Sequence, residues 1–475
     1  MKNIVLVDLP TFPKGTISLS LSYVGAFFSY KYSVTIVDLN VTTPEEFIRI
    51  CKDLSPILTG LKVSSQNYHI AVKYTDWVNS LLPECRVIWG GEFPTLQPEQ
   101  CLKHVPAIVS GLFDTVAGQL ISDLENNKLL GMYKGGNEKT PNQFPIPLLQ
   151  QYKHNSSYNR FMGLPLETTR GCTEVCTFCM VHVMQKKHYH TKPAEAIKRE
   201  IEAIGNNMIN IIDYNFGVNK QHVISTCNII EKSGAIGFTA EMCLDLLDDE
   251  ELLIALQKAR CKIIYCGLET IQEDSLKSVH KMNTNHIENY RRIIAKAQQY
   301  GIQIASGFIL AMEGTKPETF KNTLNFFEDV GIMYVKLTFL TYNPGTKAQL
   351  YYQRKGTFTS SDPAFYDGNH LSYLPANVDS EGVYGGTKWF IENFYSEEAI
   401  LRRSRKITGT EIDKQAFINY NICYSLPYHQ WIDNNIFENE KAFKTLLATP
   451  YSKPKHFIDA EEKLLEIWSK NTNRK

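Results

Sequence analysis

The sequence carries no excess of charge of either sign. Fifty lysine and arginine residues balance fifty aspartate and glutamate residues among 475, and no long run of one sign stands out. Proteins that bind nucleic acids usually concentrate positive charge in a patch or stripe. The balance therefore argues against a DNA or RNA substrate.

Long hydrophobic runs are also missing. The first eight residues, Met1–Asp8, form a short apolar run that ends in an acid, which is typical of a buried strand and not of a signal peptide. The longest apolar stretch, residues 19–30, is interrupted by serines and is too short to cross a bilayer. We therefore expect a cytoplasmic protein without membrane spans.

Cysteine is sparse. Eleven cysteines among 475 residues are an odd count, not the dense and even framework of a small secreted domain, so we expect reduced thiols and no disulfide network. The length indicates two or three domains, and a hydrophobic content of 43% is enough for sizeable cores.

Three of these cysteines nevertheless lie close together, at Cys172, Cys176 and Cys179 in a C-x3-C-x2-C spacing. A [4Fe–4S] cluster normally takes four cysteine ligands, so three of them would leave one iron open to a substrate or cofactor. A zinc site is the alternative, with His182 or His188 as a fourth ligand. The remaining cysteines show no second cluster spacing, so we predict no auxiliary cluster.

The spacing, together with the aromatic Phe178 before the last cysteine, resembles the signature of the radical S-adenosylmethionine (SAM) enzymes. The resemblance implies that the amino and carboxylate groups of SAM chelate the open iron. It also implies that an electron from the cluster cleaves the sulfonium and yields a 5′-deoxyadenosyl radical. A low-potential electron donor such as flavodoxin or ferredoxin is then an expected partner.

Residues 1–126 alternate short apolar runs with amphipathic segments, which is typical of a parallel sheet covered by helices. The pattern predicts a flavodoxin-like doubly wound α/β domain. Its predicted strands are residues 4–8, 33–38, 57–62, 86–89 and 107–109. Sheets of this kind bind ligands at the carboxyl ends of their strands.

Small and polar residues follow these strands, and small residues let a bulky ligand approach the backbone. The segment also resembles the cobalamin-binding domain of cobalamin-dependent radical enzymes, notably in the Gly-Gly-x-x-Pro-Thr turn at residues 90–95. The resemblance implies a cobalamin site formed by Thr11, Ser64, Ser65, Asn67, Gly90, Gly91, Glu92, Ser110 and Gly111.

Two features depart from that family. An Asp-x-His-x-x-Gly ligand motif is missing, and residues 110–114 read Ser-Gly-Leu-Phe-Asp where the family usually has Gly-Glu-Gly-Glu. A relic domain that only shapes the active site or dimerises is therefore the alternative to cobalamin binding.

Residues 127–160 contain several glycines and prolines and are predicted to be a linker. Six strand and helix units then follow within residues 161–350, which matches the partial (β/α)6 barrel of the radical SAM family. The predicted strands are residues 164–169, 210–213, 237–241, 263–268, 303–310 and 334–337. Residues 351–475 are rich in aromatic residues and helical in their later half, so we expect a lid and substrate region there.

The barrel strand ends offer candidate contacts for SAM, because barrels of this kind carry their chemistry at that edge. Glu241 and Glu269 are candidate acids, with substrate binding or a buried ion pair as the alternative. Asp213 or Asn215 is expected to hold the amino group, and Phe178 and Ile309 to sandwich the adenine. Ser306 is a candidate for the ribose or carboxylate, with a packed strand residue as the alternative.

The sequence thus predicts a cobalamin-dependent radical SAM enzyme, most simply a methyltransferase acting on a carbon of a small-molecule or peptide biosynthetic intermediate. A radical enzyme that uses cobalamin differently, or not at all, for ring contraction, oxidation, cyclisation or alkyl transfer is the first alternative. A non-enzymatic metal or cobalamin binder is the second alternative.

Overall fold

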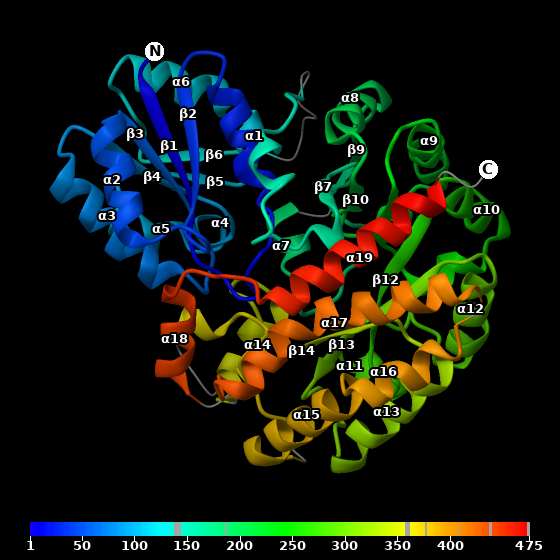
Figure 1. The fold of residues 1–475 in the computed structure, drawn as a ribbon. Helices are drawn as coiled ribbons and strands as arrows, with labels where there is room; N and C mark the ends of the chain where they lie inside the picture. The colour runs from blue at the N-terminus through cyan, green and yellow to red at the C-terminus, as the bar shows by residue number, and fades with distance from the viewer. Residues whose placement is uncertain are drawn as a thin grey trace.

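The computed structural model describes residues 1–136, 144–185, 188–356, 362–375, 378–407, 409–436 and 439–472. Two parallel sheets form the body of the molecule, and a set of long helices from the end of the chain packs against the second sheet (Figure 1). None of the described helices combines the length and the apolar character needed to span a membrane.

The first sheet has six parallel strands in the order β2-β1-β3-β4-β5-β6. Its strands are β1 (Asn3–Asp8), β2 (Ser33–Asp38), β3 (Leu58–Lys62), β4 (Arg86–Gly90), β5 (Ala107–Ser110) and β6 (Met132–Lys134). Its main helices are α1 (Leu19–Phe28), α2 (Pro44–Leu54), α3 (Tyr68–Leu81), α4 (Glu92–Leu96), α5 (Pro98–Cys101) and α6 (Ala117–Glu125). The strand order places a switch point between β1 and β3, where doubly wound sheets bind ligands. The predicted flavodoxin-like fold is confirmed.

Strand β6 lies inside the segment that the sequence predicts to be a linker. Glycine at positions 131, 135 and 136 suggested irregular chain, but Tyr133 is 2% exposed and anchors a short strand against β5. Its hydroxyl accepts from the Leu130 backbone amide and donates to Asp123 Oδ2, both at 3.0 Å. One buried aromatic residue thus outweighs the flanking glycines, and the first sheet extends to residue 134.

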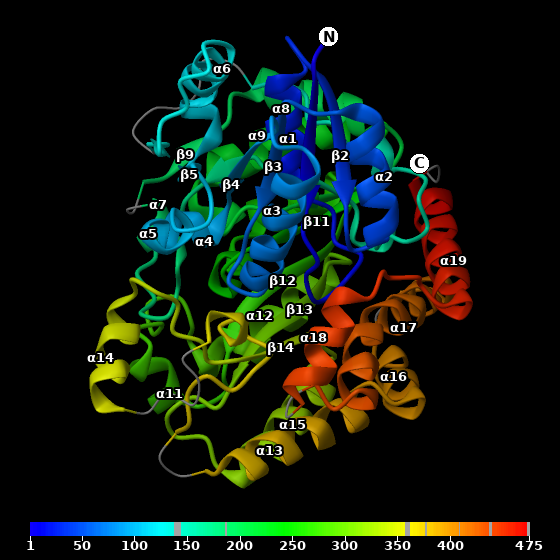
Figure 2. The same ribbon diagram turned by 90° about the vertical axis from the view of Figure 1, so that its left-hand side faces the viewer.

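The second sheet is a half barrel of six parallel strands in the order β14-β13-β12-β11-β10-β7. Its strands are β7 (Leu164–Leu166), β10 (Met208–Ile211), β11 (Gly237–Glu241), β12 (Cys261–Glu269), β13 (Gln303–Leu310) and β14 (Val335–Phe339). Helices α8 (Ala194–Ile204), α9 (Lys220–Glu231), α10 (Glu250–Lys258), α12 (Ile287–Gln299) and α13 (Pro317–Val330) connect successive strands. The predicted partial barrel is confirmed. Seen from the side, the first sheet lies over the strands of the half barrel (Figure 2).

The end of the chain is helical, as predicted. Its helices are α14 (Lys347–Lys355), α15 (Ser380–Phe394), α16 (Glu397–Ser404), α17 (Glu411–Asp433), α18 (Glu440–Ala448) and α19 (Lys455–Thr472). Helices α17 and α19 lie across the barrel strands (Figure 1). Residues of both helices share one apolar core with the inner face of the sheet.

Strand β14 is an edge of the half barrel, and its outer backbone groups find partners outside the sheet. The Val335 amide donates to the Tyr395 hydroxyl at 3.1 Å, and the Leu337 amide donates to the Tyr428 hydroxyl at 2.9 Å. The Phe339 amide donates to the Gly368 carbonyl at 2.7 Å. The helical region therefore completes the hydrogen bonds that another strand would make.

Candidate active site

The cysteine loop follows β7, at the carboxyl edge of the half barrel. Cys176 is 8% exposed, and Cys172 and Cys179 are half-buried. Burial raises the pKa of all three thiols, that of Cys176 to about 12, and the nearby Lys281 ammonium lowers it in each case. The Cys176 thiol also senses the thiols of Cys179 and Cys172, and the Cys179 thiol senses that of Cys172. The three thiols therefore lie near one another and near one ammonium group, where binding to iron in place of a proton removes the cost of burial.

The loop does not form a site for a single metal ion. Among the described residues, no three His, Cys, Asp or Glu side chains lie close enough to hold one ion. A zinc site with His182 or His188 as fourth ligand therefore finds no support in the structure. A cluster instead takes each thiolate on a different iron, so its ligands stand further apart than those of a single ion, and the assignment of a cluster to the three cysteines stays a prediction.

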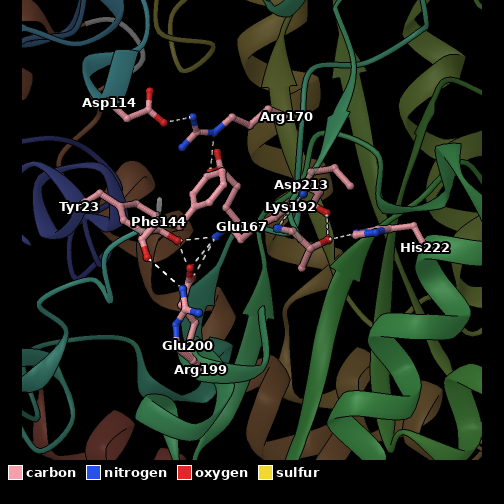
Figure 3. Close-up of polar contacts among 12 residues, drawn as sticks. Tyr23, Asp114, Phe144, Glu167, Arg170, Lys192, Arg199, Glu200, Asp213 and His222 are labelled. Atoms are coloured by element: carbon pink, nitrogen blue, oxygen red, sulfur yellow. Dashed lines mark hydrogen bonds and ion pairs between the residues drawn. The ribbon is translucent and has the colours of Figure 1, made fainter. Parts of the chain in front are cut away.

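Asp213, predicted to hold the SAM amino group, lies beneath the loop. Its carboxylate accepts from the Thr168 and Thr169 amides at 2.7 and 3.0 Å and from the Thr168 hydroxyl, which also bonds His222 Nε2 at 3.0 Å (Figure 3). Burial raises the Asp213 pKa to about 6, and these hydrogen bonds lower it. Asp213 thus anchors the chain that enters the cysteine loop, and its oxygens already have partners.

Glu269 and Lys281 form a buried ion pair beside the cysteine loop. The Glu269 backbone has a φ of +62°, a conformation that non-glycine residues rarely adopt. Lys281 Nζ binds Glu269 Oε1 and donates to the Gly267 carbonyl at 3.0 Å. Burial lowers the Lys281 pKa, but the Glu269 carboxylate and the Cys176 and Cys243 thiols together raise it above its usual value, so the ammonium keeps its charge. The strained strand end thus presents a carboxylate and an ammonium to the thiols.

Asn215 and Glu241 also lie at the carboxyl edge of the half barrel. Asn215 caps a short helix through the Gly217 amide at 3.2 Å and lies 3.3 Å from Cys243 Sγ. Burial raises the Glu241 pKa to about 7, although Lys336 lowers it. Glu241 makes no hydrogen bond or ion pair with any described residue, and it lines the interior of the half barrel.

Phe178 and Ile309, the predicted adenine contacts, pack in one apolar cluster. Ser306 is different. It is fully buried, and its hydroxyl donates to the adjacent Gly307 carbonyl at 3.0 Å. Because strand side chains alternate, Ser306 shares its face with Phe308, which packs on Phe327 of α13. The structure therefore places Ser306 in the layer between strands and helices and does not bring it to the barrel mouth.

A cavity of about 410 Å³ lies between the first sheet and the segment that leads into the cysteine loop. The wall on the first domain includes Gly60, Gly90, Gly91 and Gly111. The opposite wall includes Glu167, Thr169, Arg170, Ile212 and Tyr214 of the barrel. A Cβ at Gly91 would come within 2.8 Å of the Val63 carbonyl, and one at Gly111 within 2.3 Å of the Gly135 carbonyl, so both turns require glycine.

Only part of the predicted cobalamin set lines this cavity. Gly90, Gly91 and Gly111 do so, and Ser110 ends β5 next to them. The other predicted residues make hydrogen bonds among the loops at the same edge of the sheet. The Ser64 amide donates to Asn67, the Ser65 hydroxyl donates to Glu92, and the Thr11 amide donates to Asn40 in the loop after β2. The fit to a large planar cofactor therefore depends on the glycine wall, while the polar set organises the loops around it.

Polar side chains join the two domains around the cavity (Figure 3). Arg170 binds Asp114 of the first domain and, at 2.7 Å, Glu167 of the barrel. Lys192 binds Glu200 at 2.9 Å, and the Tyr23 hydroxyl of α1 donates to Glu200 at 2.5 Å. The Lys192 group is buried and the Arg170 group is partly buried, and both join the first domain to the barrel.

A second cavity of about 450 Å³ lies along the inner face of the half barrel. Helix α17 forms its far wall with Tyr420, Tyr424, Tyr428 and Trp431, four of the aromatic residues from which we predicted a lid. Sequence analysis missed other residues of these sites. They are Asp114, Arg170, Tyr265, Lys281 and Lys336. The position of Lys336 within a predicted strand was the available signal for that residue.

Two family models match the chain. The model described as the B12 binding domain matches residues 7–119, and that of the radical SAM superfamily matches residues 166–327. The first match spans β1 to β5, and the second runs from β7 into α13. The two matches confirm the predicted nature and order of these domains.

Several known proteins are similar to this chain. A bacteriochlorophyllide d C-8(2)-methyltransferase of Chlorobaculum tepidum is 25% identical over 346 residues, 66% of this chain and 73% of that protein. A hopanoid C-2 methylase of Rhodopseudomonas palustris is 24% identical over 302 residues, 61% of this chain and 55% of that protein.

Two solved structures share the fold. The cobalamin-dependent SAM radical enzyme OxsB with aqua-cobalamin bound has a TM-score of 0.66 at 16% identity, covering 99% of this chain and 80% of OxsB. The radical SAM methyltransferase TsrM from Kitasatospora setae, with cobalamin and a [4Fe–4S] cluster bound, has a TM-score of 0.63 at 14% identity. That match covers 89% of this chain and 99% of TsrM.

Proposed function

We propose that this chain, a radical SAM enzyme with a B12-binding domain before its barrel, is a cobalamin-dependent methyltransferase. Its acceptor is a carbon of a small-molecule or peptide biosynthetic intermediate. The observation that carries the proposal is the cavity of about 410 Å³ whose glycine wall faces the barrel residues that lead into the cysteine loop. A cobalamin held there would be close to a cluster on that loop, as transfer of a methyl group requires. The names of the relatives, which methylate a bacteriochlorophyllide and hopanoids, support the same reaction type.

Different residues are assigned to each of the three cofactor sites. Cys172, Cys176 and Cys179 hold a [4Fe–4S] cluster. We assign SAM to the adjacent pocket, with Glu269, Asn215 and Glu241 as polar contacts and Phe178 and Ile309 against the adenine. Asp213 serves that pocket indirectly, through Thr168 and Thr169.

When bound, the cluster supplies the electron that cleaves SAM, and cobalamin carries the methyl group. The chain supplies orientation and exclusion of water. Leu21, Val24, Phe27 and Phe113 give the cavity between the domains an apolar lining. The Asp114–Arg170 pair fixes the distance between its two walls. Reactive species formed there are thereby kept from solvent.

Radical SAM enzymes need an electron donor, and we propose a flavodoxin or ferredoxin for this role. The balanced charge of the chain favours a small molecule or peptide over a nucleic acid as substrate. We further propose that the protein acts in the cytoplasm, where reducing conditions keep its thiols free.

The products formed from SAM test the proposal. The anaerobic holoprotein with a reduced low-potential donor should convert SAM into both S-adenosylhomocysteine and 5′-deoxyadenosine. An enzyme that uses cobalamin for another reaction, or lacks it, gives 5′-deoxyadenosine without S-adenosylhomocysteine. A binder gives neither product. Bound cobalamin measured in the same preparation distinguishes an active site from a relic domain.

A further inference from the structure

Lys336 is an unpaired cation on the wall of the barrel cavity. It lies on β14, is solvent-accessible, and makes no hydrogen bond or ion pair with any residue that the structure describes. Lys14 lines the same cavity, but its ammonium donates to the Leu447 and Thr449 carbonyls at 2.8 and 2.7 Å. Of these two ammonium groups, Lys336 is therefore the one whose donors remain available to a bound molecule.

The Tyr265 hydroxyl is a second available donor near the same point. It has no hydrogen-bond partner among the described residues, and a Cβ placed on Gly307 would lie 2.3 Å from it. Gly307 of β13 is in register with Lys336 of β14. Burial raises the Tyr265 pKa well above its usual range, so the phenol keeps its proton. The two donors thus line one cavity from the strands on either side of Gly307, a position that carries no side chain.

This pair of donors suits one carboxylate. Its two oxygens accept one hydrogen bond from the ammonium and one from the phenol. Phosphate recognition usually employs arginine forks, and no arginine lines the described part of the cavity. The acids on the wall also limit the charge that fits. Asp367 is bound by Gln66 and His370, whereas Glu241 is unpaired and opposes a second negative charge.

The part of the wall that Tyr265, Tyr334 and α17 contribute is aromatic. Tyr265 stacks with Tyr334 at a centroid distance of 6.4 Å, and Tyr334 meets Tyr424 of α17 at 3.8 Å. Tyr420 lies parallel to Tyr334 at 5.3 Å. Ring faces and edges at these spacings favour a planar unsaturated ligand over a flexible aliphatic one. A volume of about 450 Å³ is near the lower end for small-molecule sites and suits a few fused rings.

We propose that the barrel cavity binds the methyl acceptor as a planar aromatic monocarboxylate, held by Lys336 and the Tyr265 hydroxyl and stacked on the tyrosines of α17. The statement that the ligand is the acceptor rests on the proposed function. The statement about ligand chemistry rests on the cavity alone. The site lies on the inner face of the barrel, below the strand ends that carry Glu269 and the cysteine loop.

A matched pair of probes tests the carboxylate. Calorimetric titration of the anaerobic holoprotein with 2-naphthoate and with its neutral isostere 2-naphthamide should show about 10-fold or more preference for the acid. K336M should reduce that ratio to about one while leaving the affinity for the amide unchanged. Y265F should reduce the ratio by a smaller factor, and K336R should retain most of it. K321M, which removes an exposed lysine on the outer helix α13, should behave as the wild type.

Equal affinities of the wild-type protein for acid and amide would overturn the proposal, and so would an undiminished preference in K336M. Tighter binding of 2-naphthylmethylammonium than of 2-naphthoate would assign the cavity to a cation facing Glu241. Decanoate bound as tightly as 2-naphthoate would overturn the aromatic part. If K336M also fails to bind 2-naphthamide, the substitution has damaged the cavity itself. The proposal is then judged by the preference of the wild-type protein and of K336R for the acid over the amide.

These binding experiments require neither cleavage of SAM nor transfer of a methyl group. A protein that prefers the acid but forms no S-adenosylhomocysteine therefore refutes the proposed function and leaves the ligand class standing. The reverse result refutes the ligand class alone.

Discussion

Arg170 and Asp114 form an ion pair across the boundary between the two domains, although 56 positions separate them in the chain. Arg170 lies two residues before Cys172, and Asp114 lies in the segment that follows β5 of the first sheet. The pair is 15% and 7% exposed at its two side chains. Contact between the first domain and the segment that leads into the cysteine loop is thus made by a charged pair that is largely shielded from salt.

Removal of the charge at Asp114 should loosen this contact. D114N leaves Arg170 with Glu167 alone, so we expect a loss of about 1–3 kcal/mol in the free energy of unfolding, measured with urea. The ratio of S-adenosylhomocysteine to 5′-deoxyadenosine should also fall, because the two walls of the cavity are less well fixed. D76N, at an exposed position on α3, serves as the control. Unchanged stability and product ratio would mean that the pair is incidental.

The cluster ligands can be tested by metal content. C176A should reduce iron from about four per chain to near zero and abolish 5′-deoxyadenosine. C227A removes a buried thiol on α9 and should keep both. Iron and activity retained in C176A would exclude the cluster assignment.

Gly90 is the position at which bulk should displace cobalamin. A Cβ there would meet only Val109, at 3.8 Å, so a larger side chain extends into the cavity instead of clashing with backbone. Leucine at Gly91 would be strained by a φ of +112° and is less informative. G90L should lose cobalamin, measured by absorbance, while iron and 5′-deoxyadenosine persist. G118L, on open space at α6, is the matched control. Cobalamin bound normally by G90L would place the corrin elsewhere.

Glu269 should contribute to SAM affinity. E269Q removes the charge and leaves the Lys281 ammonium unpaired, so SAM binding measured by equilibrium dialysis should weaken about 10-fold or more. Iron content should not change. E273Q, at an exposed position on α11 (Glu273–Ser278), should bind SAM normally. Normal affinity in E269Q, with lowered stability, would restrict the pair to a structural role.

Glu241 should make ligand binding depend on pH. Burial raises its pKa to about 7, and although Lys336 and Lys281 lower it, Glu269 and Asp213 also raise it. The acid is thus mostly neutral below pH 7 in the folded state, whereas it ionises near its usual pKa of 4.5 when unfolded. The stability that Glu241 contributes is therefore present at low pH and lost as pH rises through about 7.

The affinity for 2-naphthoate should also decrease as pH rises, because ionised Glu241 repels a second anion. It should fall between pH 6 and 8 in the wild type, while E241Q binds more tightly and with little pH dependence. The neutral 2-naphthamide provides the control. If the affinity of the wild-type protein for 2-naphthoate does not change between pH 6 and 8, Glu241 does not act on the bound carboxylate.

The two sheets were predictable because parallel strands are buried on both faces and appear as continuous apolar runs. Residues 237–241 and 303–310, for example, form strands with the predicted bounds. The cysteine triad was recognisable because its members are neighbours in the sequence, and the assignment of a cluster to it stays a prediction. Contacts such as Arg170–Asp114 depend on how two domains pack, and no local pattern encodes that packing.

The sequence also did not show to which face of a strand each side chain points. Ser306 and Gly307 are adjacent, yet one side of β13 faces the helices and the other faces the cavity. A shift of one residue reverses the assignment of every side chain on a strand that is buried on both faces. Because apolar residues occupy both faces of β13, the sequence offers no alternation from which to choose.

The hydroxyl groups of Tyr395 and Tyr428 have a consequence for assembly. A six-stranded half barrel that ends in an open edge invites another chain to add a strand there. With the Val335, Leu337 and Phe339 amides already bonded by two tyrosines and a loop, β14 offers little to an intruding strand. The same groups take the place of a further strand at this edge of the sheet. The half barrel therefore ends at its sixth strand because two phenols and a loop use the hydrogen-bonding groups that a seventh strand would need.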